Sequence, residues 1–65
     1  MDLFAEYALK NRPNELMAKA AEVGTDVHTY VASEVLGISV SQVTEVDRQK
    51  SKVAFFAAFY GSPAK

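Results

Sequence analysis

Apolar side chains recur at helical spacing in four stretches of the chain, separated by proline, glycine and short polar links. This pattern predicts four helices, over about residues 2–11, 13–23, 26–36 and 45–60, and a short turn of helix over about 40–43. The sequence has no internal repeat and no low-complexity tract. The fold class we expect is therefore all-α, with residues 1–65 forming a single partial domain of about four short helices.

Residues that commonly end helices support this division. Pro13 disfavours helix at the residue before it and suits the first turn of a new helix, so it separates the first two helices. Gly24 and Gly37 are expected to end the second and third helices, because glycine readily adopts the left-handed conformation of a C-terminal cap. Two pairs have the form of a capping box, in which residues three apart satisfy each other's backbone amides: Ser39 with Gln42, and Thr44 with Asp47.

The last predicted helix carries a row of side chains at four-residue intervals: Arg48, Lys52, Phe56 and Tyr60, with Gly61 next. Each step along this row turns about 40° beyond a full turn and rises about 6 Å, so the four side chains share one sector of the helix. Cations suit phosphates, and an aromatic face suits a sugar or a base. Such cations are also common on a solvated face, and such aromatic residues in a core, so spacing alone leaves both interpretations open.

Composition limits the class of protein. With 65 residues and no cysteine, the chain has a small core and no disulfide or cysteine-based metal site to stabilise it. A formal net charge of −1 argues against a free-standing nucleic-acid binder. The longest apolar run, 53–60, is far shorter than the roughly 20 residues that span a bilayer. We expect no membrane helix, and no signal peptide either, because Asp2 and Glu6 interrupt the N-terminal stretch.

The same apolar run fills the second half of the last helix on every side, as in a helix that is buried on several sides. Three short helices would cover it only thinly. We expect the chain either to associate with a partner or to be a piece of a larger protein that supplies the missing contacts.

Residues before the last helix extend the pattern. A helix that starts Asp-x-His and ends Ala-x-Glu-Val-x-Gly precedes a Val-Thr link and then Arg-x-x-x-Lys-x-x-x-Phe-x-x-x-Tyr-Gly. This arrangement resembles the fingers region of family A DNA polymerases, the DNA polymerase I type, in which the final helix is motif B, or the O helix. The match needs no gap, and its positions are Asp26, His28, Ala32, Glu34, Val35, Gly37, Val43, Thr44, Arg48, Lys52, Phe56, Tyr60 and Gly61. A motif with its expected structural context is stronger evidence than the motif alone.

The resemblance implies roles toward an incoming dNTP. Arg48 and Lys52 match residues that contact its triphosphate, and Lys52 is also the candidate general acid for the leaving pyrophosphate. His28 matches a histidine near the β- and γ-phosphates, although an exposed histidine in a first helical turn is an equally good interpretation. Asp26 and Glu34 are interpreted as structural.

The base and template contacts follow in the same way. Phe56 matches the ring that packs on the deoxyribose and base of the dNTP. Tyr60 and Gly61 match the pair beside the templating position, where the tyrosine stacks in the open state and moves as the fingers close. The family often has Asn-Phe-Gly around the central ring, whereas this chain has Phe55 and Ala57 beside it, which makes that face more apolar.

The N-terminus resembles the end of motif A, with Asp2 as the candidate sugar-gate residue. In that alignment the motif A carboxylate lies before Met1 and the motif C carboxylate lies beyond Lys65. We therefore expect the intact polymerase to use Mg²⁺, this chain alone to bind none, and the isolated chain to be inactive. The implied partners are dNTP, primer-template DNA and the palm and thumb of the polymerase, in the cytoplasm of a bacterial or phage-infected cell.

Two other classes of function stay open. The first is a small helix-turn-helix DNA-binding regulator, suggested by the spacing of Ser33 and Gly37, in which residues 40–42 would face DNA bases. Acidic residues next to that segment count against it, because they would repel phosphates. The second is a small helical protein-interaction module that binds a partner helix through a surface formed by Phe55, Phe56 and Phe59.

Overall fold

The structure is a computed structural model that describes residues 3–60, without the side chains of Ala5 and Tyr60. Its elements are α1 (Leu3–Lys10), α2 (Pro13–Val23), α3 (Val27–Leu36), the 3₁₀ turn η1 (Val40–Gln42) and α4 (Glu45–Tyr60). The described residues form no strand, so the expected all-α fold with four helices is confirmed. The ends of each element lie within one residue of those expected from the sequence.

The helix ends follow from the capping residues. Gly24 and Gly37 adopt φ angles of 91° and 70°, which side chains disfavour, and their amides donate to carbonyls of the preceding helical turn. At the start of α4, the Asp47 amide donates to Thr44 Oγ1 at 3.1 Å and the Thr44 amide donates to Asp47 Oδ2 at 3.3 Å. This reciprocal pair is the expected capping box, and it fixes the residue at which α4 begins.

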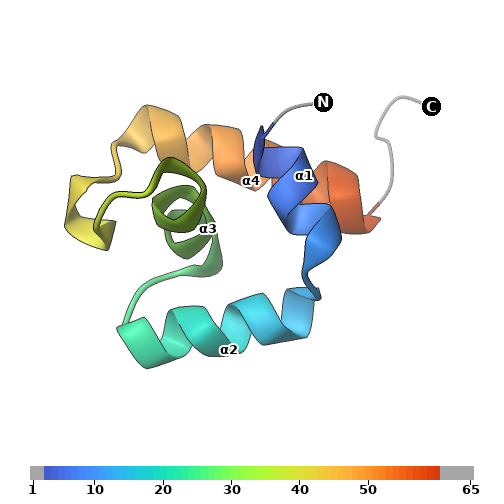
Figure 1. Cartoon of the computed structure of the whole chain (residues 1–65), viewed down its shortest axis with the longest axis horizontal. Helices are drawn as coiled ribbons and strands as arrows, with labels where there is room; N and C mark the ends of the chain where they lie inside the picture. Colours follow the sequence, from blue (N-terminus) through green and yellow to red (C-terminus); the bar gives the residue numbers. More distant parts are fainter. Residues whose placement is uncertain (1–2, 61–65) are drawn as a thin grey trace.

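Helix α3 is the central element of the fold. It contacts α1, α2 and α4, while α4 also packs along α1. In Figure 1 α3 is seen nearly end-on, with α2 on one side of it and α4 on the other. Each of the other helices can therefore bury an apolar face against α3.

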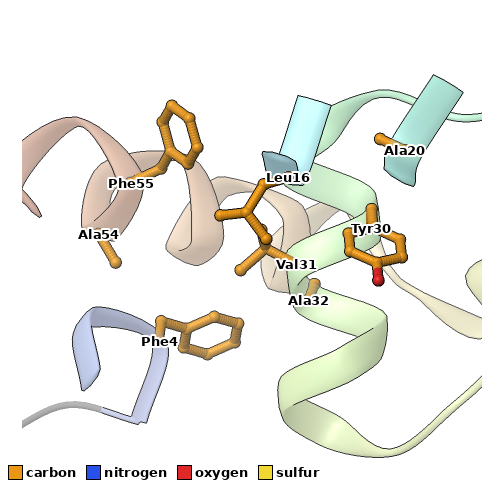
Figure 2. Packing of buried hydrophobic residues seen from close by; sticks show 8 residues of the cluster. All are labelled: Phe4, Leu16, Ala20, Tyr30, Val31, Ala32, Ala54 and Phe55. Carbon is orange, nitrogen blue, oxygen red and sulfur yellow. The ribbon is translucent and has the colours of Figure 1, made fainter. Parts of the chain in front are cut away.

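The buried core draws residues from all four helices: Phe4, Leu16, Ala20, Tyr30, Val31, Ala32, Ala54 and Phe55. Figure 2 shows Leu16 and Val31 at the centre of this cluster, with Phe4 and Phe55 on either side. Phe55 is 1% exposed and is the largest side chain that is fully buried among the described residues. Because burying one large apolar side chain is worth roughly 1.5–3 kcal/mol, Phe55 anchors α4 to the rest of the fold.

Helix α4 is covered on one side only by the described residues. Its outer side exposes Val46, Val53 and Phe56, although the apolar run suggested a helix buried on several sides. No described helix is both long enough and apolar enough to cross a membrane.

Candidate nucleotide-binding site on α3 and α4

The row of side chains on α4 begins at the edge of its buried face and turns away from it. Ser51, Ala54 and Phe55 point into the core, and Arg48 and Lys52 are half-buried beside them. Phe56 lies further round the helix and is 43% exposed. The drift arises because four residues exceed one helical turn by about 40°, so Phe56 is more exposed than the half-buried Arg48 and Lys52.

His28 brings α3 to this row. It lies in the first turn of α3, and its ring meets those of Phe55 and Phe56 edge to face, with centroids 5.3 Å and 5.5 Å away. Edge-to-face contacts of this kind are favourable for aromatic rings. His28 therefore links the buried ring of Phe55 to the exposed ring of Phe56, and it is not the exposed histidine that the alternative interpretation described.

The surroundings of His28 favour its neutral form. Burial lowers the pKa of the imidazole below its ordinary value, and the positive charges of Arg48 and Lys52 lower the pKa further, while Asp26 partly opposes them. Its Nδ1 atom is buried and has no hydrogen-bond partner among the described residues. A buried polar atom without a partner costs free energy, and the contacts of the His28 ring with Phe55 and Phe56 offset part of that cost.

Arg48 is held by an ion pair between helices. Its Nε donates to Asp26 Oδ2 at 3.1 Å, and its Nη1 lies 3.9 Å from Glu45 Oε2. Burial alone would raise the pKa of Asp26, but the hydrogen bond from Thr29 and the charge of Arg48 together lower it below the ordinary value. Asp26 was interpreted as structural, and the structure gives it this contact with a candidate phosphate-binding residue.

Lys52 forms no ion pair with any described residue, which leaves its ammonium group available. The positive charge of Lys52 lowers the pKa of His28, as does that of Arg48, so both cations lie close enough to His28 to interact with it electrostatically. Two cations and a neutral imidazole beside an exposed aromatic ring can together bind a phosphate chain that carries a flat group.

Three of the proposed site residues cannot be placed. Asp2 and Gly61 lie outside the described residues, and Tyr60 ends α4 with its side chain outside them as well. Within the described part of the chain, no group of three or more His, Asp or Glu residues could hold a metal ion.

A separate depression of about 230 Å³ lies between α1 and α3. It is lined by Leu3, Glu6, Tyr7, Lys10, Glu34 and Val35. Burial, together with the nearby Tyr30 and Glu34, raises the pKa of Tyr7 to about 12, so this phenol stays neutral. With two carboxylates in its lining, the depression would repel a triphosphate, and it is distinct from the row on α4.

The geometry argues against both alternative classes of function. The segment that would read DNA bases, Val40–Gln42, is a single 3₁₀ turn, which is too short for a recognition helix. The surface of three phenylalanines does not exist either, because Phe55 is buried and packs against Phe59 with ring centroids 4.9 Å apart. Only Phe56 of the three is exposed.

Comparison with known proteins gives one informative likeness. No protein-family model matches the chain, and no solved structure matches it. The chain is 42% identical over 61 residues to DNA polymerase I of Aquifex aeolicus (strain VF5). The aligned part covers 94% of this chain and 10% of that relative. Almost the whole chain is therefore similar to a segment of DNA polymerase I, and it spans about a tenth of that protein's length.

Proposed function

We propose that this chain is the fingers segment of a DNA-directed DNA polymerase of the DNA polymerase I type, and that it binds the incoming dNTP. One observation carries the proposal: His28 of α3 meets Phe56 of α4 and lies in the field of Arg48 and Lys52. These four residues come from two helices, yet they converge on one surface. The likeness to a DNA polymerase I segment supports the same conclusion.

Each group has a distinct part in binding. The planar guanidinium of Arg48 can donate two parallel hydrogen bonds to phosphate oxygens, and the ammonium of Lys52 can neutralise charge one turn further along the helix. In the tautomer that is protonated at Nδ1, His28 would donate to the phosphate chain once the side chains that cover this atom move. Phe56 is 43% exposed, and its ring would pack on the deoxyribose and base of the nucleotide.

In the intact polymerase these residues would act during template-directed synthesis. Lys52 would donate a proton to the leaving pyrophosphate as general acid, which requires its ammonium group to lie within hydrogen-bond reach of a phosphate oxygen. Tyr60 and Gly61 would lie beside the templating base of the primer-template DNA. Carboxylates of the palm would hold Mg²⁺, which would neutralise negative charge on the phosphates. The palm and the thumb belong to the remainder of the polymerase.

Binding of dATP measured by isothermal titration calorimetry at low salt tests the proposal, with Lys50→Ala as a matched control. Lys50 carries the same charge on the same helix but lies about 160° round it from Lys52. Because a charge-assisted hydrogen bond is lost, Lys52→Ala should weaken binding about tenfold, and Lys50→Ala by less than about twofold. Equal weakening by the two changes would show a general charge effect, and no binding by the unchanged chain would contradict the proposal.

Primer extension gives an independent test of the fragment interpretation. The 65-residue chain alone should not extend a primer in the presence of Mg²⁺ and dNTPs, because the described residues contain no cluster of three or more His, Asp or Glu side chains for the catalytic metals. Metal-dependent synthesis by the purified chain would contradict this expectation.

A further inference from the structure

Asp26 precedes α3 as its N-cap residue, yet its carboxylate does not cap that helix. The backbone at Asp26 is extended, and no hydrogen bond joins its side chain to the amides of the first turn. Aspartate at this position usually accepts such a bond. Here Oδ1 accepts from the Thr29 hydroxyl at 2.6 Å, and Oδ2 accepts from Arg48 Nε at 3.1 Å. The carboxylate is therefore fixed by its own helix and directed at α4.

The ion pair lies where a ligand can reach it. The Arg48 side chain is 35% exposed and that of Asp26 is 42% exposed. A phosphate that binds the guanidinium side-on needs Nε together with one Nη group, and Nε is the atom that Asp26 occupies. A triphosphate would also be repelled by the negative charge of the same carboxylate.

We propose that Asp26 is a positioning residue that holds Arg48 in the empty site and competes with the triphosphate for Arg48 Nε. This inference rests on the proposed function. Exposed ion pairs contribute little stability, so a triphosphate can displace the carboxylate, and the competition lowers the affinity of the site. Release of the triphosphate is helped by the return of Asp26 to the guanidinium.

The chain offers a matched control for the loss of this charge. Glu45 also faces the Arg48 guanidinium, but its carboxylate is 3.9 Å from Nη1 and makes no hydrogen bond to Arg48. Asp26→Asn and Glu45→Gln each remove one negative charge near Arg48. Because the Asp26 side chain makes no capping hydrogen bond to α3, Asp26→Asn should leave that helix folded.

The test is the affinity for inorganic tripolyphosphate, measured by calorimetry at low salt without added metal. We expect Asp26→Asn to bind about fivefold more tightly than the unchanged chain, and Glu45→Gln to differ by less than about twofold. In an Arg48→Gln background, Asp26→Asn should bring no further gain, because the effect acts through Arg48.

A nuclear magnetic resonance measurement separates competition from a merely structural role. The Nε–H signal of Arg48 should shift on Asp26→Asn, and in the unchanged chain it should shift when tripolyphosphate is added. Unchanged or weaker binding by Asp26→Asn contradicts the proposal, and so does an equal gain in the Arg48→Gln background. If the unchanged chain and Asp26→Asn both fail to bind tripolyphosphate, the proposed function itself is contradicted, and the competition with it.

Discussion

The two faces of α4 differ in burial, although both carry apolar side chains. The inner face buries Ser51, Ala54 and Phe55, while the outer face exposes Val46 and Val53. Phe55 and its neighbour Phe56 make the contrast clearest, since the first is 1% exposed and the second 43%. One helix thus supplies both the anchor of the core and an open surface, and the candidate site lies along the boundary between them.

The contrast separates stability from binding. Contacts of the inner face decide whether the four helices hold together, because that face completes a core shared by all of them. The boundary residues Arg48 and Lys52 are half-buried, and in the proposed function they contribute to binding through their positive charges. Substitutions on the inner face should therefore change mainly the stability of the fold. Substitutions of Arg48 or Lys52 should change mainly nucleotide binding, provided that the chain remains folded.

The largest expected effect is the loss of the Phe55 ring. Phe55→Ala should reduce the free energy of unfolding by about 3–5 kcal/mol, because it leaves a cavity in the core. For a 65-residue chain with a total stability of roughly 3–10 kcal/mol, that change unfolds much of the population. Phe56→Ala, the matched change one residue later, should cost less than about 1 kcal/mol.

Urea denaturation followed by circular dichroism measures both changes. Comparable losses of stability from Phe55→Ala and Phe56→Ala would mean that the inner and outer faces are not distinct.

A smaller effect, of opposite sign, is expected at Ser51. Its side chain is fully buried, and its Oγ has no hydrogen-bond partner among the described residues. Ser51→Ala should therefore raise the free energy of unfolding by about 1 kcal/mol, since it removes an unsatisfied hydroxyl and improves helix propensity.

Ser33 provides the control for that change, because it is also buried in a helix but donates to the Tyr30 carbonyl at 2.9 Å. Ser33→Ala should lose about 0.5 kcal/mol in the same urea experiment. Destabilisation by Ser51→Ala would show that its hydroxyl has a partner.

The smallest expected effect is a dependence of stability on pH at His28. Burial and the nearby cations lower the pKa of His28 in the folded chain, so near and below pH 6.5 the unfolded chain binds more protons than the folded one. Stability is therefore full above the unfolded pKa, falls as pH drops through about 6.5, and levels off below the folded pKa.

The urea midpoint at about pH 7.5 and about pH 5.5 measures this fall, in a range above the titration of Asp26. His28 is the one histidine of the chain, so His28→Gln should remove most of the difference. The same dependence in the variant would assign it to another group.

The sequence predicted the helices well because local signals determine them. Proline at the start of α2, glycine at the ends of α2 and α3, and the Thr44 and Asp47 pair each act within a few residues. The apolar run in the second half of α4 gave less information, since an apolar residue on every side of a helix does not indicate which side is covered. Which phenylalanine enters the core depended on the positions of α1 and α3.

The candidate site could be predicted in part. The four-residue spacing put Arg48, Lys52 and Phe56 in one sector of α4, and the resemblance added His28 from another helix. The ion pair of Arg48 with Asp26 joins residues 22 positions apart, and no periodicity in the sequence indicates such a contact. The orphaned hydroxyl of Ser51 was also missed, because the sequence alone does not show which serine is buried.

The most direct test of the central claim is a titration of the isotope-labelled chain with dATP, followed in its proton–nitrogen correlation spectrum. Binding at the boundary of the two faces predicts shifts that concentrate at His28, Arg48, Lys52 and Phe56, while the signals of α2 stay in place. Shifts concentrated on α2, or no shift at saturating dATP, would contradict the assignment of the dNTP site to α3 and α4.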